Sequence, residues 1–520
     1  MPAGNPDPER RREPRHDTYD AIVVGSGIGG LSAAAFLAKA GQRVLVVERQ
    51  DGPGGYAHAF QRGPYTFDPA IHFIAQADKG LLLEAYLEFL GVADRCTMLP
   101  LDTLYAASFP GLQFVAPHGL EEYIAAYARL FPSHAREVEE YIRLFNKIHL
   151  ESHQLPPQLA FRDLDEIVER FPVLFKYTKA TLGDVLDEYI SDARVRAACA
   201  APWPYNGTPP SRLSFTTFSQ VLSAQFDGTC YCQGGFQRLA EAFVAALELH
   251  GGEIVFGQRV ERITVEAGRA TGVTLADGGR LRAAAVISNA DARQTFDTLV
   301  GDEHLPAPFV RRLHRLAPSL SACVLYAATR LDLRQVAPAY ETFLYRHWDH
   351  EETYRDILAG QPGGMWVAVP TLVDPSLAPP GEHLVILTSL ATYNGDRDWE
   401  RDKGRMTEAL LDEVEGHFPG FRANLTHAEV ATPPTLERFT LNQAGAIYGW
   451  EFTPLQSGSK RMPHQAPVAG LYLAGHWTQP GAGSTRVFVS GIHAAQLVLR
   501  DAGLADAAAA LRHPDLPPVT

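Results

Sequence analysis

Apolar residues recur along the chain with two different periods, which together predict both strands and helices. Short apolar runs at 21–24, 43–47, 284–288 and 470–475 are typical of buried parallel strands. Apolar residues at helical spacing at 32–40, 239–250 and 487–499 predict helices. Buried strands that alternate with helices are typical of an α/β domain. The pattern therefore predicts one sheet domain that is assembled from three separated pieces of chain.

Two long insertions separate those pieces. The first runs from about 79 to 222 and has mainly helical patterns, rich in Phe, Tyr and Leu. The second runs from about 292 to 463 and mixes the two patterns, with β-like runs at 321–328 and 383–390. Together they predict an inserted α+β domain. We expect this inserted domain to determine which substrate is bound.

A glycine motif follows the first apolar run. Gly25, Gly27 and Gly30 have G-x-G-x-x-G spacing, and Glu48 ends the next apolar run. In a dinucleotide fold the first glycine makes a tight turn, the second lets the backbone approach a pyrophosphate, and the third lets the helix pack against the sheet. The helix N-terminus attracts the phosphate anion, and the acidic residue binds a ribose. The chain therefore predicts a Rossmann-like dinucleotide site.

Two further glycine turns favour FAD over NAD. Arg49, Gly54 and Gly55 follow soon after Glu48, where a second loop can pass the pyrophosphate. Near the C-terminus, the glycine-rich stretch 481–484 opens a helix. The positive end of that helix would stabilise negative charge on a reduced flavin.

Three blocks of sequence, at 19–68, 231–263 and 470–498, resemble one family of enzymes. They are similar to the carotenoid desaturases, carotene isomerases and retinol saturases, which are FAD enzymes with an amine-oxidase-type fold. The resemblance covers about a third of the chain, in the right order. It implies a Rossmann-like FAD domain and a hydrophobic polyene or isoprenoid substrate.

The resemblance also implies roles for individual residues. Gly25, Ser26, Gly27 and Gly30 would hold the FAD pyrophosphate, and Glu48 the adenosine ribose. The other expected cofactor contacts are Arg49, Gly54 and Gly55, Val260 at the adenine, and Gly475, Thr485, Arg486 and Val487 by the ribityl chain and flavin. Many relatives have an acidic residue at the position of His476, so the role of this histidine stays open.

Two residues are candidates for catalysis. His72, in the segment FDPAIHFI, matches a histidine of the retinol saturase-like pattern and could donate a proton or orient the substrate. A histidine between Ile71 and Phe73 also fits an ordinary core residue. Arg486 is the second candidate, as a flavin or substrate contact, and His58 is a weaker one.

Composition limits the classes of function. The net charge of −14 argues against nucleic-acid binding. The sequence contains five scattered cysteines, no metal-ligand spacing and no second dinucleotide motif. The polar N-terminus lacks an apolar leader, and no apolar run is long enough to span a bilayer. We expect a cytoplasmic protein, for which contact with the inner face of a membrane is compatible with an apolar substrate; the oligomeric state stays open.

The expected organisation follows from these patterns. A disordered tail is expected at 1–18, the FAD-binding domain at 19–105, 225–300 and 465–510, and the substrate-binding domain at 106–224 and 301–464.

The expected function is FAD-dependent oxidoreduction of carbon–carbon double bonds in a long polyene such as a carotenoid or retinoid. Desaturation, saturation and cis–trans isomerisation all fit, and the fold alone does not choose among them. Oxidation of an amine or another natural-product intermediate is an alternative. A non-catalytic prenyl-lipid carrier is a further alternative, although the three cofactor blocks look intact.

Overall fold

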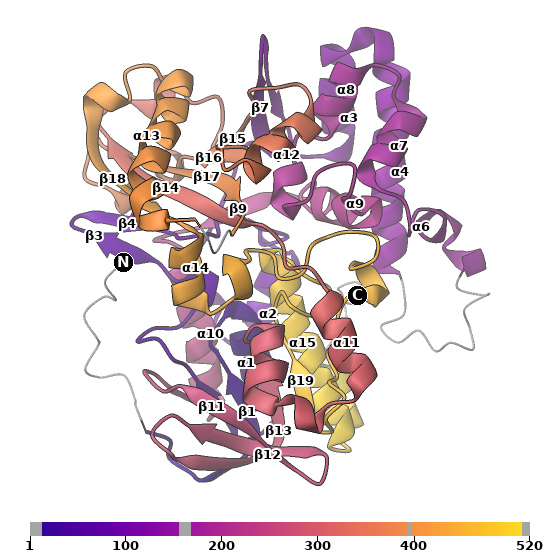
Figure 1. Ribbon diagram of the computed structural model, residues 1–520, viewed down its shortest axis with the longest axis vertical. Coiled ribbons are helices and arrows are strands. Elements are labelled where there is room, and N and C mark those ends of the chain that lie inside the picture. Colours follow the sequence, from indigo (N-terminus) through magenta and orange to yellow (C-terminus); the bar gives the residue numbers. More distant parts are fainter. Residues whose placement is uncertain (1–12, 155–167, 394–396, 512–520) are drawn as a thin grey trace.

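The computed structural model describes residues 13–154, 168–393 and 397–511, which form two seven-stranded sheets (Figure 1). Of the expected N-terminal tail, residues 1–12 lie outside the described residues. The remainder is attached to the first sheet: Thr18 begins β1 (Thr18–Val24), and the Arg15 N–H donates to the Glu253 carboxylate at 3.0 Å.

The first sheet is mainly parallel and draws its strands from three separated segments. Its parallel strands are, in order, β10 (Glu253–Val255), β2 (Val44–Val47), β1, β13 (Arg280–Ser288) and β19 (Leu471–Leu473). The antiparallel strands β11 (Val260–Glu266) and β12 (Arg269–Leu275) extend it beside β13. This arrangement confirms the predicted Rossmann-like domain in three pieces.

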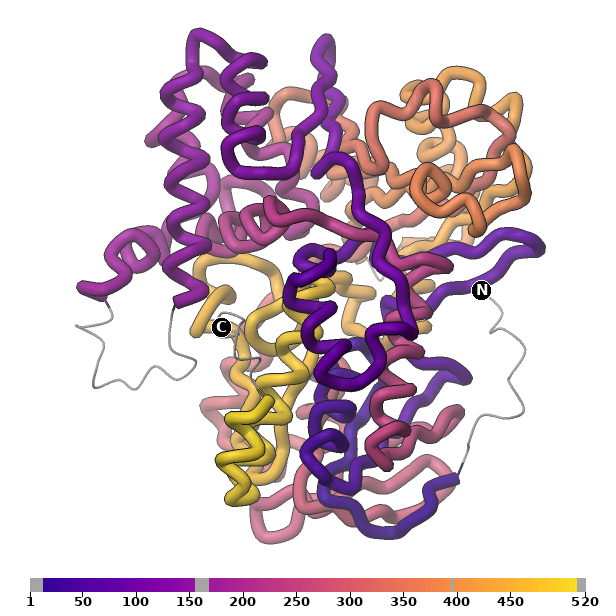
Figure 2. Tube along the Cα trace, turned by 180° about the vertical axis from the view of Figure 1, so that it is seen from behind, coloured from indigo at the N-terminus to yellow at the C-terminus, as the bar shows by residue number. Residues whose placement is uncertain are grey.

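Side chains of β1 alternate between two buried layers, as the strand period requires. Ala21 and Val23 join the core with α1 (Ile28–Lys39), α10 (Gln237–Leu249) and α15 (Ser484–Asp501). Ile22 and Val24 join the core on the opposite face, with Trp450 and Trp477. The C-terminal helix α15 packs against α1 from the other end of the chain, and Figure 2 shows the yellow segment beside the indigo one.

The second sheet belongs mainly to the second insertion. Its order is β18 (Leu425–Ala431), β14 (Ser321–Thr329), β17 (His383–Ala391), β16 (Met365–Ala368), β15 (Glu341–Leu344), β7 (Tyr105–Phe109) and β8 (Leu112–Ala116). Neighbouring strands are antiparallel except β15 and β7, which are parallel. The helix α13 (Trp399–His417) packs on this sheet and shares a core with it.

The first insertion contains the expected helices but also strands that its pattern did not predict. Its helices are α2 (Leu82–Leu90), α3 (Leu120–Leu130), α4 (Ala135–His153), α6 (Pro172–Lys176), α7 (Leu182–Tyr189), α8 (Ala193–Cys199) and α9 (Phe215–Ser223). The strands β6 (Met98–Pro100), β7 and β8 interrupt them. The helical pattern therefore described only part of this block, because β7 is stabilised by β15, a partner far away in sequence.

Short strands connect the two halves. They are the hairpin β3 (Phe60–Arg62) and β4 (Tyr65–Phe67), and a small sheet of β5 (Ile74–Ala75), β9 (Thr229–Cys232) and β6. The remaining α-helices of the described residues are α11 (Ala307–Arg315), α12 (His350–Leu358), α14 (Pro433–Thr440) and α16 (Ala505–Ala510). The strand β5 lies against α15, and this contact brings the segment around His72 to the first turn of that helix.

Candidate active site

Two glycine turns meet at the carboxyl ends of β1 and β2. The first contains Gly25, Ser26 and Gly27, and the second contains Gly54 and Gly55. The Gly54 N–H donates to the Ser26 carbonyl at 2.9 Å, and a Cβ on Gly55 would lie 3.2 Å from the Gly27 Cα. The φ of 121° at Gly54 also favours glycine. The two turns thus present bare backbone, which suits close approach by a phosphate group.

Asn289 lies among these glycines, at the end of β13, although the sequence pattern did not single it out. A Cβ on Gly27 would lie 2.5 Å from its Nδ2 atom, and one on Gly475 would lie 2.6 Å from its Oδ1 atom. Gly30 has a different place, since a Cβ there would lie 2.3 Å from the Gly25 carbonyl oxygen. Gly30 therefore lets α1 approach the sheet.

Glu48 follows β2 and is 8% exposed. Its Oε2 atom accepts hydrogen bonds from the Ser26 N–H at 2.8 Å and the Ser26 hydroxyl at 2.6 Å, and its Oε1 atom accepts one from the Gln50 N–H at 2.7 Å. Arg49 instead reaches α14, where its guanidinium donates to the Phe439 carbonyl at 2.6 Å. The Glu48 carboxylate is thus placed at the glycine turn, and Arg49 ties the backbone next to it to helix α14.

A cavity of about 1450 Å³ brings the predicted residues together. Its walls come from both large sheets and from the helical insertion. Of the predicted site residues only Gly30 lies outside the lining, which includes Gly25, Ser26, Gly27, Glu48, Arg49, Gly54, Gly55, His72, Val260, Gly475, Thr485, Arg486 and Val487. The same cavity is lined by apolar and aromatic side chains, among them Ile71, Phe73, Tyr205, Trp366, Ile447 and Tyr448.

The first turn of α15 faces this cavity. The Ser484 hydroxyl donates to the Phe73 carbonyl at 3.3 Å, and the Thr485 hydroxyl donates to the Ala75 carbonyl at 2.7 Å. The first N–H groups of a helix have no carbonyl partner inside it, and the helix dipole adds positive potential there. The helix end is therefore suited to a ligand that is negatively charged or becomes so.

Two arginines, the buried Arg461 and the half-buried Arg486, add positive charge beside the same turn. Arg486 donates from Nη2 to the Pro480 carbonyl, but its buried Nη1 atom has no hydrogen-bond partner within the described residues. Burial lowers the pKa of Arg486 to about 10. Arg461 is 1% exposed and donates to the backbone carbonyls of Tyr448, Trp450, His476 and Thr478.

The two other candidate histidines also line the cavity. His58 contacts the second glycine turn through its Nδ1 atom, 2.8 Å from the Gly55 carbonyl. Burial, followed by the charge of Arg461, lowers the pKa of His476 to about 3. His476 is therefore neutral at physiological pH, and it does not supply the negative charge of the acidic residue found there in many relatives.

His72 lies in an aromatic part of the cavity wall. The centroid of its ring is 5.0 Å from that of Phe73, 5.9 Å from that of Tyr205 and 5.8 Å from that of Trp366. Its Nε2 atom lies 3.2 Å from Oε2 of Glu341, a buried residue of β15. Burial alone would lower the pKa of His72, but the Glu341 carboxylate raises it above the ordinary value. His72 is thus a titratable group paired with a buried carboxylate, beside aromatic side chains of the cavity wall.

Sequence reasoning missed three residues of this region. Asn289 had a signal, because it ends a buried apolar run as polar site residues of parallel sheets do. Glu341 and Arg461 had none, since their importance comes from burial and from partners distant in sequence.

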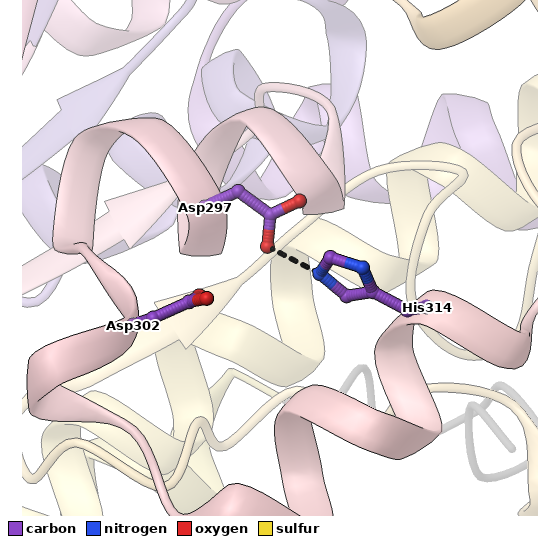
Figure 3. Close-up of side chains that lie close together, drawn as sticks. All are labelled: Asp297, Asp302 and His314. Atoms are coloured by element: carbon purple, nitrogen blue, oxygen red, sulfur yellow. Dashed lines mark hydrogen bonds and ion pairs between the residues drawn. The ribbon is translucent and has the colours of Figure 1, made fainter.

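A separate group of side chains could be mistaken for a metal site. Asp297, Asp302 and His314 converge on the surface (Figure 3). All three are exposed, and His314 Nε2 already pairs with Asp297 Oδ1 at 3.1 Å. We assign no metal to this cluster.

FAD, the cofactor expected from the sequence, fits these observations. The glycine turns form a cradle that a Cβ would fill, and the Arg486 Nη1 atom is a buried donor without a partner among the described residues.

Within the described residues, no helix is both long and apolar enough to cross a membrane.

Comparisons with known proteins identify the family of this chain. The model of the family "Flavin containing amine oxidoreductase" matches residues 28–499, which is most of the chain.

Curated relatives are similar over nearly the whole length. Prolycopene isomerase of Daucus carota is 28% identical over 94% of this chain and 81% of its own. Phytoene desaturase (lycopene-forming) of a Paracoccus species is 28% identical, with 92% and 97% covered. All-trans-retinol 13,14-reductase of Danio rerio is 26% identical, with 88% and 82% covered.

Among solved structures, wild-type putrescine oxidase bound to putrescine has a similar fold. It aligns with a TM-score of 0.64 at 15% identity, covering 93% of this chain and 99% of its own. The chain therefore belongs to the flavin containing amine oxidoreductase family and is an FAD-dependent oxidoreductase.

Proposed function

We propose that this enzyme acts on carbon–carbon double bonds of a long apolar polyene or isoprenoid of the carotenoid or retinoid class. The observation that carries the proposal is the cavity of about 1450 Å³, which joins the glycine turns to an aromatic wall. Its size and apolar walls suit a long hydrocarbon. The names of the relatives, which refer to prolycopene, phytoene and retinol, support the same class.

The chain's own residues would divide the work. The turns around Gly27 and Gly55 would hold the pyrophosphate, Glu48 the adenosine ribose, and the backbone of Val260 the adenine. Bound FAD would exchange a hydride with the substrate. Arg486 and the first turn of α15 would stabilise negative charge at the flavin end of the cofactor.

The wall would position the substrate. The rings of Phe73, Tyr205 and Trp366 would hold the hydrocarbon and exclude water from the reacting carbons. His72 is the titratable group in their midst, and it would donate or accept the proton that accompanies hydride exchange.

The test is reconstitution of the purified protein with FAD, followed by anaerobic incubation of reduced enzyme with carotenoid and retinoid substrates. Saturation adds two hydrogens to the product and isomerisation leaves its mass unchanged. Desaturation by the oxidised enzyme removes two hydrogens. Any of these products supports the proposal.

Two outcomes would contradict it. Turnover of amines with release of hydrogen peroxide, and none of polyenes, would indicate an amine oxidase. A colourless protein that binds a prenyl lipid but takes up no FAD would indicate a carrier.

A further inference from the structure

We propose that Glu341 is a positioning residue that holds His72 as a cation at the cavity wall, from where His72 delivers the proton when a polyene double bond is saturated. The proposal rests on the function proposed above and deepens it. Among the three reactions that the fold allows it favours saturation, because saturation is the one that consumes a proton.

The geometry of three side chains carries the proposal. Glu341 begins β15 and is 2% exposed. Its Oε2 atom lies 3.2 Å from His72 Nε2, and its Oε1 atom accepts a hydrogen bond from the Tyr205 hydroxyl at 2.7 Å. His72 Nδ1 lies 3.2 Å from the Ala70 carbonyl. An oxygen atom lies 3.2 Å from each ring nitrogen, and the carboxylate beside Nε2 favours a positive charge on the ring.

The electrostatic surroundings favour the same charge state. Burial alone would lower the pKa of His72, but the Glu341 carboxylate and the Ala70 carbonyl outweigh it and raise the pKa above the ordinary value. Burial, followed by the charge of Glu341, raises the pKa of Tyr205 well above its usual range. Tyr205 therefore remains a phenol that donates to Glu341, and it does not compete with His72 as an acid.

The pairing leaves the Nε2 proton of His72 available. Glu341 Oε2 accepts no hydrogen bond within the described residues, so the Nε2–H bond is not aligned with it despite the short separation. His72 lines the cavity, whereas Glu341 lies behind it. The carboxylate thus stabilises the charge of the imidazolium, while the N–H group can reach a bound substrate.

His72 also lies close to the expected position of the flavin. The carbonyls of Phe73 and Ala75 accept hydrogen bonds from Ser484 and Thr485, the first two residues of α15. A polyene bound beside that helix end would have the cofactor and His72 near adjacent carbons.

The proposed step balances in atoms and electrons. One carbon of the double bond receives a hydride from reduced FAD, and the hydride's electron pair forms the new C–H bond. The π pair moves to the adjacent carbon and forms a second C–H bond with the proton from His72. The imidazole is left neutral and FAD oxidised. Solvent returns the proton, and a two-electron donor such as dithionite reduces FAD again.

Other titratable groups lie near His72, and their effect on its pKa must be distinguished from that of Glu341. Tyr340 donates a hydrogen bond to the His72 carbonyl, and Asp68 acts on the ring through its charge. Burial raises the pKa of Asp68 to about 7, although hydrogen bonds from Tyr231 and Phe236 oppose this. Asp68 is therefore a second titratable group whose charge acts on His72, and a variant at Asp68 belongs in the test.

The first measurement needs no substrate. NMR of histidine-labelled holoenzyme follows the His72 resonance, assigned with His72→Asn, through a pH titration. We expect a midpoint above about 6.5 in the wild type and a fall of about one pH unit or more in Glu341→Gln. Glu382→Gln is the matched control, because Glu382 also accepts a tyrosine hydroxyl, that of Tyr65, and it should leave the midpoint unchanged.

The second measurement is the pH profile of saturation by dithionite-reduced enzyme in D₂O. The wild-type product should carry two deuteriums, one from His72 and one transferred as the hydride, because reduction by dithionite in D₂O also places deuterium on the flavin. The kcat should fall as pH rises through the His72 midpoint, because the acid form is lost. Glu341→Gln should move that fall to lower pH, and Asp68→Asn should move it less. His72→Asn should lower kcat about a hundredfold with KM within about twofold.

Three results would overturn the proposal: a His72 midpoint unchanged in Glu341→Gln, an unchanged pH profile in that variant, or full kcat in His72→Asn. If Glu341→Gln does not fold, Glu341→Asp keeps the charge and should preserve the high midpoint. The titration decides the Glu341–His72 pairing even if no polyene is turned over. A lack of polyene turnover would count against the proposed function and not against the pairing.

Discussion

At the scale of single residues, the cofactor site depends on the absence of side chains as much as on their presence. The side-chain amide of Asn289 lies against Gly27 and Gly475, and it leaves no room for a Cβ at either glycine. The same bare backbone is what a pyrophosphate needs for close approach. A methyl group at either glycine would push Asn289 out of place and cover the surface of the turn.

We therefore expect Gly27→Ala to weaken FAD binding. The new Cβ would lie 2.5 Å from Asn289 Nδ2, and such overpacking costs about 1–3 kcal/mol, equivalent to roughly a tenfold to hundredfold loss of affinity. Titration of apoprotein with FAD, followed by flavin fluorescence, measures the effect. Gly404→Ala is the control, because Gly404 is exposed on α13 with open space around it. Equal affinities in the two variants would contradict the expectation.

At the scale of elements, the contact between α1 and α15 joins the two ends of the chain. Gly491 of α15 lies against the first turns of α1, where a Cβ would be 2.3 Å from the Gly29 carbonyl oxygen and 2.8 Å from the Ala33 nitrogen. These atoms belong to the backbone and cannot move independently. The close approach places the first turn of α15 beside the glycine turn that precedes α1.

Gly491→Ala should consequently destabilise the fold. We expect the free energy of unfolding to fall by about 1–3 kcal/mol, measured by urea denaturation. Gly416→Ala, on an exposed position of α13 with no neighbour within 4 Å, should instead add up to about 1 kcal/mol through helix propensity. A stability of Gly491→Ala at or above the wild type would show that the helices can separate without cost.

At the scale of the whole molecule, one cavity collects residues from all three segments of the first sheet and from both insertions. Gly25, Val260 and Gly475 come from the three segments, while Gln220 and Trp366 come from the first and second insertions. A ligand that fills this cavity contacts parts of the chain that are far apart in sequence. The cofactor should therefore stabilise the folded state in addition to taking part in the reaction.

Removal of FAD should lower the melting temperature. Binding only to the folded state adds about 2.7 kcal/mol when free FAD is at a hundred times its dissociation constant. Calorimetry of apoprotein with increasing FAD measures the gain. Glu48→Ala, which removes the carboxylate expected to hold the ribose, should need more FAD for the same rise. A melting temperature independent of FAD concentration would refute this role of the cofactor.

The fold and half of the site followed from local patterns. The runs that became β1, β2, β13 and β19 were recognisable because each is apolar over its whole length or most of it. The strands β7 and β8 were not, because β7 pairs with β15, which is far away in sequence, and β8 pairs with β7. Gly30 was placed with the pyrophosphate contacts, but it lies outside the cavity lining.

The sequence by itself determined the cofactor and the glycine turns with their neighbouring acidic residue, because a dinucleotide fold fixes these residues at short spacings along one stretch of chain. The tertiary structure alone decided which groups meet in the aromatic part of the cavity wall. His72, Tyr205 and Glu341 are separated by more than a hundred residues from one to the next, and only the folded chain brings them into contact. Charge pairing in a buried wall depends on distance in space, and no local pattern along the chain encodes it.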